Sequence, residues 1–487
     1  MWPRSRASRL ILWSALIAGL GCRVYVMFTD EGIYWPDEIH QSLEPAHRLV
    51  FGYGLIAWEF VDGARNWAFP GAIAGLMSAI AALGGDRPHI YLPVIRLVFV
   101  AMSLGTALGI YRLARGWGAS EEAAAAGGAV WALSAPSIYF AHRAMSENAA
   151  TVAAIWGVGF MLAFDSAQAR APRASRRSLW LGASLLGLSV LFRIQMGVLV
   201  IGALGVLAAR RNWRGLLESL AVLSVWGVAY GAVDALTWSD APGARYGGWF
   251  HSAILYVRFN LVEGGSAQWG TSPPDYYAEF VFRSMPIIAA CLGIGLLAGL
   301  RYASALSVLA LLFVVALSAI PHKEFRFILP MLPLAVAATV TSFDALPRRP
   351  RLAGIGLLLV GAVVSAVTFS SLTWGDLGAH QHHPDAKASA WDDPGPINRL
   401  LLAANRQRDL CGLRVDAAPA FHGASTYLHR PVHIYHDVPE SSGLYNYAIA
   451  RVGSGLPFVA RDHDMELVRV TAKGCKPDPG YDWRLPR

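Results

Sequence analysis

Residues 348–373 read RRPRLAGIGLLLVGAVVSAVTFSSLT, and this stretch decides the class of fold. Three arginines, Arg348, Arg349 and Arg351, are followed by an uncharged run from 352 to 373. A helix needs about 20 apolar residues to cross the hydrocarbon core of a bilayer, and arginine gathers on the cytoplasmic side of such helices. The stretch therefore predicts a membrane-spanning helix that begins on the cytoplasmic side.

The composition of the whole chain agrees with that stretch. Of 487 residues, 55% are hydrophobic and only 15% are charged, and the mean hydropathy is +0.40. Soluble domains carry about 25% charged residues, so this composition excludes a soluble enzyme, a disordered chain and a small disulfide scaffold. It predicts an all-α polytopic membrane protein.

Arginine clusters separate further apolar stretches and set the orientation. If the N-terminus is cytoplasmic, every second loop carries arginine, so the net charge of +8 is interpreted as a topology signal rather than a nucleic-acid surface. The uncharged run 66–85 is expected to lie on the outer leaflet, because a crossing there would place the arginines of 170–177 outside. About eleven spans are predicted, at 10–28, 91–111, 123–141, 147–164, 178–192, 194–209, 215–237, 284–300, 302–320, 327–343 and 352–373.

The outer side then receives a large first loop, 29–90, a second loop, 238–283, and the C-terminal region. We predict a transmembrane catalytic domain at 1–373 and a small α/β or β-rich outer domain at 374–487, where 431–435 and 467–470 alternate apolar and polar residues. A disulfide between Cys411 and Cys475 is expected only if this region faces an oxidising compartment.

The first outer loop contains an adjacent pair of carboxylates, Asp37 and Glu38, directly after Pro36. Ionisable groups at a membrane boundary are often functional. The pair could supply a general base or a cation ligand, or it could simply start a solvated helix. Tyr53, Trp58 and Glu59 add aromatic rings and another acid, which suit sugar binding or an interfacial aromatic belt.

A second polar cluster interrupts the apolar runs at 321–327. Lys323 is the only lysine in the first 386 residues, and His322 and Arg326 lie beside it. Snorkelling anchors at a helix end would explain these residues. We favour a cationic clamp for a phosphate at the membrane surface.

Three further polar or aromatic segments are predicted to lie on the outer side. Arg143 precedes Ser146, Glu147 and Asn148, where Ser146 could simply cap a helix. Residues 269–277 form a rigid aromatic turn that could cover a lipid or a sugar. His380, His382 and His383 with Asp385 are interpreted as a polar linker, and no metal site, Walker motif, dinucleotide fingerprint or nucleotide-sugar domain is predicted.

These segments together resemble the family 22 glycosyltransferases, the mannosyltransferases of GPI-anchor and N-glycan precursor assembly. Residues 322–330 resemble the family's HKExRFxxP signature, and 36–47 resemble its PDExxQxxEPxH segment. Residues 51–59, 143–148 and 269–277 resemble further family segments, although Glu147 stands where the family usually has asparagine. The tail segment 426–430 resembles a YLHR element of the GPI third-mannose branch.

The resemblance implies a GT-C fold with a lumenal or periplasmic active site under the first outer loop. It also implies a polyprenyl- or dolichyl-phosphate-mannose donor, a lipid-linked glycan acceptor, an inverting displacement and no cofactor. The expected location is a bacterial inner membrane, or the endoplasmic reticulum of a eukaryote. The implied roles are catalysis by Asp37 or Glu38, donor-phosphate binding by His322, Lys323 and Arg326, and sugar or acceptor binding by Glu44, His47, Tyr53, Trp58, Glu59, Arg143, Trp269 and Tyr277.

Two alternatives remain open at this point. A related enzyme could transfer arabinose, glucose or a modified sugar from the same kind of carrier. A multispanning transporter would need polar groups at the bilayer midplane and often an inverted repeat, and the sequence has neither.

Overall fold

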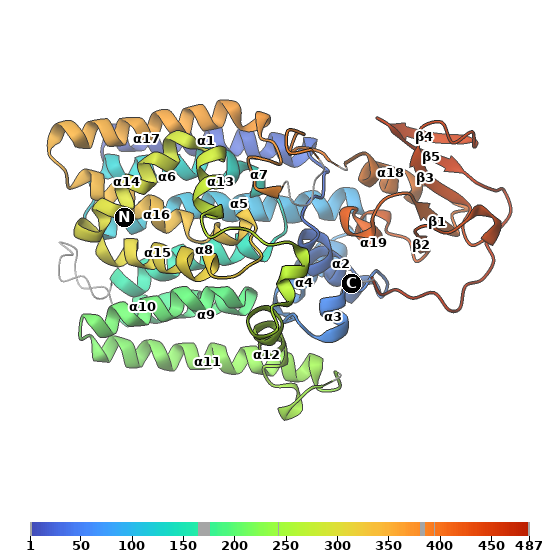
Figure 1. Cartoon of the computed structure of the whole chain (residues 1–487), viewed down its shortest axis with the longest axis horizontal. Helices are drawn as coiled ribbons and strands as arrows, with labels where there is room; N and C mark the ends of the chain where they lie inside the picture. Colours follow the sequence, from blue (N-terminus) through green and yellow to red (C-terminus); the bar gives the residue numbers. More distant parts are fainter. Residues whose placement is uncertain (1, 164–175, 242, 380–384, 394, 486–487) are drawn as a thin grey trace. The chain divides into compact units, whose positions relative to one another are not determined.

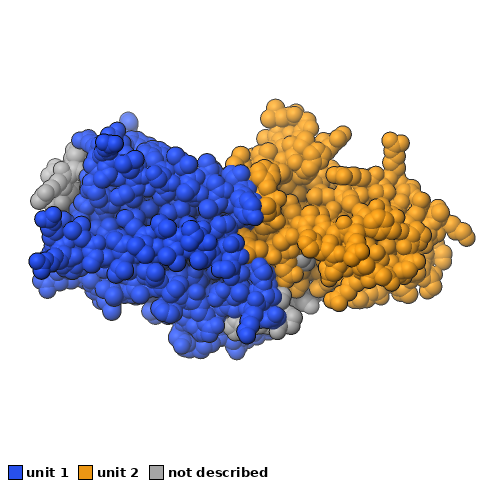
Figure 2. Space-filling model, turned by 90° about the horizontal axis from the view of Figure 1, so that it is seen from above, with its two compact units in different colours: residues 1–26, 98–390 blue, residues 27–97, 391–487 orange. Residues whose placement is uncertain are grey.

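A computed structural model describes residues 2–163, 176–241, 243–379, 385–393 and 395–485. The chain divides into two compact units, coloured separately in Figure 2. Unit 1 comprises Met1–Val26 and Val98–Ala390, and unit 2 comprises Met27–Leu97 and Trp391–Arg487. Packing thus groups the first outer segment with the C-terminal region. The predicted domain boundary at 373/374 follows membrane topology instead, and it stays a prediction.

Unit 1 is helical throughout its described part, and α9 packs against α8, α10 and α11 (Figure 1). Its main elements are the end of α5 (Pro88–Gly116), α6 (Glu121–Leu133), α7 (Ala135–Phe140), α8 (Ser146–Ala163), α9 (Arg176–Phe192), η2 (Ile194–Met196), α10 (Gly197–Ala209), α11 (Trp213–Trp238), α12 (His251–Val257), η4 (Arg258–Val262), η5 (Gly265–Trp269), α13 (Tyr276–Ser284), α14 (Pro286–Tyr302), α15 (Ser304–Ser318), η6 (Phe325–Ile328), α16 (Leu332–Asp344) and α17 (Arg348–Thr368), together with most of α1 (Arg6–Thr29).

Four helical segments of the described chain are long and apolar enough to cross a membrane: Arg6–Thr29, Pro88–Gly116, Trp213–Trp238 and Arg348–Ser371. Other apolar helices are shorter, including α4 (Ala68–Ala82), which occupies the run expected on the outer leaflet. The predicted stretch 123–141 is divided into α6 and α7. The count of eleven spans stays a prediction.

Glycine allows α8 and α9 to approach closely. A Cβ atom built on Gly182 would lie 2.4 Å from the backbone nitrogen of Met161, and one on Gly157 would lie 2.9 Å from Leu186 Cγ. Real side chains cannot occupy those positions, so the two backbones touch only because both residues are glycine. Small residues serve the same purpose wherever membrane helices pack closely.

Arg23 lies inside α1 and is completely buried. Its guanidinium donates hydrogen bonds to the carbonyl oxygens of Gly19, Trp131 and Ala132 and to the hydroxyls of Ser103 and Ser137. A guanidinium has five N–H donors, and all five are used on neutral oxygens. The residue ties α1 to α5, α6 and α7.

Unit 2 contains short helices and one sheet. The five strands have the order β2-β1-β3-β5-β4, with β1 parallel to β2 and β3 and with β5 antiparallel to β3 and β4. Tyr435, Tyr445, Ala448 and Val468 form a buried cluster in this unit. The elements are η1 (Ile39–Leu43), α2 (Glu44–Phe51), α3 (Trp58–Asp62), α4, α18 (Gly395–Asn405), α19 (Ala424–Leu428), β1 (Gly412–Val415), β2 (His433–Tyr435), β3 (Tyr447–Arg451), β4 (Phe458–Asp462) and β5 (Met465–Arg469).

Two sequence expectations about the C-terminal region are met. The alternating segments 431–435 and 467–470 contain β2 and most of β5. Cys411 and Cys475 form a disulfide, which links the start of β1 to the chain beyond β5. Whether 374–487 is a separate domain stays a prediction.

Candidate active site

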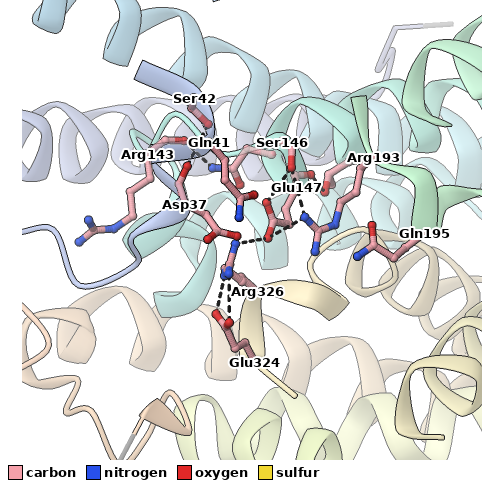
Figure 3. A network of polar contacts seen from close by, with 12 residues as sticks. Asp37, Gln41, Ser42, Arg143, Ser146, Glu147, Arg193, Gln195, Glu324 and Arg326 are labelled. Carbon is pink, nitrogen blue, oxygen red and sulfur yellow. Dashed lines mark hydrogen bonds and ion pairs between the residues drawn. The ribbon is translucent and has the colours of Figure 1, made fainter. Parts of the chain in front are cut away.

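Arg326 lies at the centre of a buried ion-pair network in unit 1 (Figure 3). Its side chain is in the short turn η6, and the turn is 3₁₀ rather than α-helical. Arg326 Nε lies 2.6 Å from Glu324 Oε2, and its Nη1 lies 2.7 Å from Glu147 Oε1. The guanidinium is therefore held by two carboxylates, one local and one 179 residues away in the sequence.

Arg193 completes this network from the junction of α9 and η2. Arg193 Nη1 lies 3.1 Å from Glu147 Oε1 and donates to Ser146 Oγ at 3.2 Å. Both guanidinium groups also lie over the ring of Phe327, with centroid distances of 5.1 Å for Arg193 and 5.0 Å for Arg326. Two arginines thus face two glutamates, so the charges of the network balance.

His322 and Lys323 fasten the loop at 270–272 to the polar cluster. His322 bonds through Nδ1 to the carbonyl of Gly270 and through Nε2 to Glu324 Oε1 at 3.0 Å. Lys323 Nζ donates to the carbonyls of Ser272 and Ile320 at 2.8 and 2.7 Å. Burial lowers the pKa of the Lys323 ammonium. Both side chains shape this loop, and their role as phosphate ligands stays a prediction.

Glu324 is the acid within the same cluster. Burial alone would raise the pKa of its carboxyl, but Arg326 and His322 outweigh burial and hold that pKa well below its usual range. Glu324 therefore remains ionised and fixes Arg326 in one orientation. This carboxylate anchors the cationic side chain predicted to bind phosphate.

The other predicted residues of unit 1 have separate surroundings. Arg143 is buried, with its guanidinium 4.5 Å from the centroid of the Tyr139 ring. Trp269 is 37% exposed and packs edge-on against His322. Tyr277 is 2% exposed on α13.

Asp37 lies in unit 2 with a side chain that is 21% exposed, and its Oδ2 forms an ion pair with Arg65 Nη2 at 3.9 Å. Glu59 is nearby and buried, and its Oε1 accepts a hydrogen bond from Gln41 Nε2 at 2.7 Å. Burial raises the pKa of Glu59 to about 7, with Arg65 opposing and Asp37 adding to the shift. Two carboxyl groups thus share one guanidinium.

Glu38, the predicted alternative base, is 3% exposed. Its charge adds to the effect of burial in raising the pKa of the Tyr427 phenol. The structure therefore separates the adjacent acids: Asp37 reaches solvent, and Glu38 points into unit 2.

Glu44 and His47 are completely buried and hold unit 2 together. The Glu44 carboxylate accepts hydrogen bonds from the backbone of Leu55, Ser425 and Thr426 and from the Thr426 hydroxyl. These bonds join α2 to the first turn of α19, where a carboxylate also suits the helix dipole. The roles of Glu44 and His47 as sugar or acceptor ligands stay predictions.

His47 connects two neighbouring segments. Its Nδ1 lies 3.2 Å from the carbonyl oxygen of Tyr53, and its Nε2 lies 3.0 Å from His429 Nδ1. Burial, with His429 adding to it, lowers the pKa of His47 to about 3. Tyr53 packs edge-on against this imidazole, and Trp58 begins α3. The sugar-binding roles of Tyr53 and Trp58 stay predictions.

Sequence reasoning assigned no role to Glu147, Arg193 or Arg65. In the sequence, Glu147 stands out only because the resembled family usually has asparagine at this position. The structure explains the glutamate, because its carboxylate pairs with two arginines. Among the described residues no group of three metal-ligating side chains is arranged to hold a metal ion. His380, His382 and His383 lie outside the described residues.

Sequence comparisons give the family. The family profile described as the Alg9-like mannosyltransferase family matches residues 15–375. GPI mannosyltransferase 3 of Yarrowia lipolytica is 29% identical over 72% of this chain and 67% of that protein. Mannosyltransferase APTG1 of Arabidopsis thaliana is 28% identical over 65% of this chain and 56% of that protein. The chain thus spans between about half and two thirds of the length of these relatives.

Solved structures share the fold. ArnT from Cupriavidus metallidurans bound to undecaprenyl phosphate aligns with a TM-score of 0.65 and 12% identity, over 96% of this chain and 99% of that one. AglB from Archaeoglobus fulgidus, in complex with an inhibitory peptide and a dolichol-phosphate, aligns with a TM-score of 0.58 and 12% identity, over 93% and 70%. The expected GT-C fold of a multi-pass membrane protein is confirmed. The chain belongs to the Alg9-like mannosyltransferase family.

Proposed function

We propose that the protein transfers mannose from a polyprenyl- or dolichyl-phosphate carrier to a lipid-linked glycan or glycolipid, at the periplasmic or lumenal face of its membrane. Family membership and relatives named GPI mannosyltransferase 3 support the sugar. Two structures of the same fold contain undecaprenyl phosphate and dolichol-phosphate, which supports a lipid phosphate as the carrier.

The exposure of Asp37 is the observation that carries the proposal. A general base must come within hydrogen-bond distance of the hydroxyl that it deprotonates. Asp37 has a side chain that is 21% exposed. The neighbouring acids Glu38, Glu44 and Glu59 are 3%, 0% and 8% exposed. Of these four acids, Asp37 is therefore the one best able to meet a substrate.

The reaction then follows as one displacement. The hydroxyl oxygen of the acceptor attacks the anomeric carbon, and its proton passes to the carboxylate of Asp37. The bond between that carbon and the phosphate oxygen breaks, and its electrons leave with the lipid phosphate. Attack opposite the leaving group inverts the anomeric centre, so a β-linked donor gives an α-linked product.

The leaving phosphate gains negative charge as the bond breaks, and fixed cations stabilise such charge effectively. We assign this role to Arg326, whose orientation is fixed by Glu324 and Glu147. His322 and Lys323 contribute by holding the 270–272 loop in place. No cofactor beyond the lipid-linked donor is proposed, and chelation by EDTA in the transfer assay tests for a metal.

A second candidate is transfer of another sugar from a lipid phosphate. It keeps the lipid phosphate that the ArnT structure contains as the carrier and changes only the sugar, which a shared fold at 12% identity leaves open. Membranes that contain the protein should be supplied with polyprenyl-phosphate-linked mannose, glucose and arabinose in parallel. The mannosyl donor alone should give product under the proposal.

The product should be identified by mass spectrometry and by digestion with linkage-specific mannosidases. We expect one added hexose, released by an α-mannosidase. Transfer of glucose or arabinose instead would select the second candidate. Absence of any transfer, with solute flux in proteoliposomes, would contradict both and favour a transporter.

A further inference from the structure

The buried polar atoms of unit 1 that have no hydrogen-bond partner include Gln195 Oε1 and the hydroxyl of Tyr277. Buried polar atoms are nearly always hydrogen-bonded, so each exception needs an explanation. Neither atom belongs to the ion-pair network. Both are neutral groups that a bound polar molecule could satisfy.

Gln195 is held in a defined orientation. It lies in η2, the short turn that joins α9 to α10, and its side-chain nitrogen donates a hydrogen bond to the hydroxyl of Tyr256. Because the nitrogen is committed, the oxygen points the other way and is buried without a partner. Figure 3 shows Gln195 beside Arg193, at the edge of the polar network.

Tyr277 borders the same group of residues from α13. Burial is the main cause that raises the pKa of its phenol, and the charges of Glu324, Arg193 and Arg326, together with Tyr256, also act on it. Tyr277 lies on α13, which contacts η6, the turn that carries Arg326. Gln195 lies two residues after Arg193, so both unpartnered atoms belong to elements that border the network.

The charges around the two unpartnered atoms indicate what could bind there. Arg193 and Arg326 carry the positive charge that a phosphate would meet, whereas Gln195 Oε1 and the Tyr277 hydroxyl are uncharged and would contact a neutral part of the same ligand. An amide oxygen accepts a hydrogen bond, and a phenol hydroxyl can both donate and accept. Neighbouring hydroxyl groups of a sugar match this pair, and the aromatic ring of Trp269, packed on His322, belongs to the same cluster.

We propose that Gln195 and Tyr277 form a subsite that binds the hexose of the lipid-phosphate donor through its hydroxyl groups. This proposal rests on the proposed function, because it takes a lipid-phosphate sugar as the donor. It assigns Gln195 a direct role in selecting the sugar. Replacement of either side chain should weaken binding of the sugar and leave binding of the lipid phosphate unchanged.

The test uses Tyr277→Phe, which retains the ring and removes only the unpartnered hydroxyl, and Gln195→Met, which removes the unpartnered oxygen together with the nitrogen that bonds Tyr256. The dissociation constants of the full-length protein are measured for polyprenyl-phosphate-mannose and for polyprenyl phosphate, from ligand-induced shifts in thermal unfolding. We expect the wild type to bind the mannosylated carrier at least tenfold more tightly, which is about 1.4 kcal/mol. Each variant should lose most of that difference.

Thermal unfolding without ligand separates the proposal from a structural role. Tyr277→Phe removes an atom that has no hydrogen-bond partner in the protein, so this variant should unfold at or above the wild-type temperature. Gln195→Met also removes the hydrogen bond to Tyr256 and should unfold somewhat below the wild-type temperature. Tyr302→Phe is the matched control, because Tyr302 is 40% exposed at the end of α14. It should retain the full preference for the mannosylated carrier.

Two results would overturn the proposal. One is equal binding of the two carriers by the wild type; the other is an unchanged preference in both variants. Failure of the proposed function is a separate result, because it is a lack of mannose transfer by the wild type. If the wild type preferred the mannosylated carrier but transferred no mannose, the sugar subsite would stand and the proposed transferase activity would be wrong.

Discussion

Two polar clusters of the molecule use the same kinds of side chain in different ways. In unit 1, two arginines face two glutamates, and Arg193, Arg326 and Glu147 are 4%, 2% and 1% exposed. In unit 2, the carboxyl groups of Asp37 and Glu59 share Arg65, and Asp37 reaches solvent. The first arrangement holds its charges fixed. The second includes the carboxyl group of Glu59, whose pKa of about 7 lets it gain or lose a proton near neutral pH.

Asp37→Asn should have the largest effect. The amide cannot accept the proton of the acceptor hydroxyl, and a positioned base contributes roughly 10²–10⁴-fold to the rate. Transfer in membranes should fall by that factor while the amount of protein stays at the wild-type level. Asp86→Asn, at an exposed position of the same unit, is the control and should transfer normally. Normal transfer by Asp37→Asn would remove Asp37 from the mechanism.

Arg326→Ala should cause the largest loss of stability. It leaves Glu147 and Glu324 without one guanidinium in a buried site, and breaking a buried ion pair typically costs about 3–5 kcal/mol. The midpoint of thermal unfolding in detergent should fall markedly. A midpoint close to that of the wild type would show that the network is no tighter than a surface ion pair.

Glu59→Gln should alter the pH dependence of stability. The folded protein holds the Glu59 proton up to about pH 7, whereas the unfolded chain releases it near 4.5. This group therefore stabilises the fold at low pH, and its contribution of about 3 kcal/mol is lost as the pH rises from 4.5 to 7.

The measurement for Glu59 is the difference in unfolding free energy between wild type and Glu59→Gln across pH 4.5–8. His40 and His47 are buried with a lowered pKa and give the opposite slope in both proteins, so the difference cancels them. We expect the wild type to lose its relative stability as the pH rises. A difference that stays constant with pH would show that Glu59 ionises normally.

Arg283→Ala should have the smallest effect. Arg283 pairs with Glu279 at 2.7 Å, one turn away on α13, but the two side chains are 52% and 39% exposed. Exposed pairs of this spacing contribute less than about 0.5 kcal/mol. The unfolding midpoint should barely change, and a shift as large as that of Arg326→Ala would show that burial does not decide the strength of these pairs.

The sequence predicts the kind of fold well, because apolar length and arginine placement act locally. It also singles out Asp37 and Arg326 through short motifs. It does not predict the partner of Arg326, because Glu147 is 179 residues away and nothing in the spacing specifies which acid faces it. Glu44 is the converse case, since a carboxylate in a sugar-binding motif becomes a structural acceptor once four protein donors surround it.

The break within the predicted span 123–141 shows a local signal that hydropathy misses. Ser134 has an extended backbone conformation, and Pro136 lies in the first turn of α7. Proline has no N–H to bond the carbonyl four residues back, and its ring clashes with that carbonyl, so it disrupts a helix interior but is tolerated in the first turn. The turn chemistry at Pro136 therefore predicts two helices where the apolar pattern alone predicts one.

Arg23 has a consequence for the order of biosynthesis. An arginine at the centre of a lone membrane helix costs about 2.5–3.5 kcal/mol to insert. The acceptor of Arg23 on α1, the carbonyl of Gly19, is synthesised together with it. The acceptors at Ser103, Trp131, Ala132 and Ser137 are translated about 80 to 114 residues later. The ribosome therefore synthesises α1 before it synthesises most of the groups that accept hydrogen bonds from Arg23. Stable insertion of the first helix depends on chain that follows it, so a nascent chain that ends before residue 137 lacks part of that solvation.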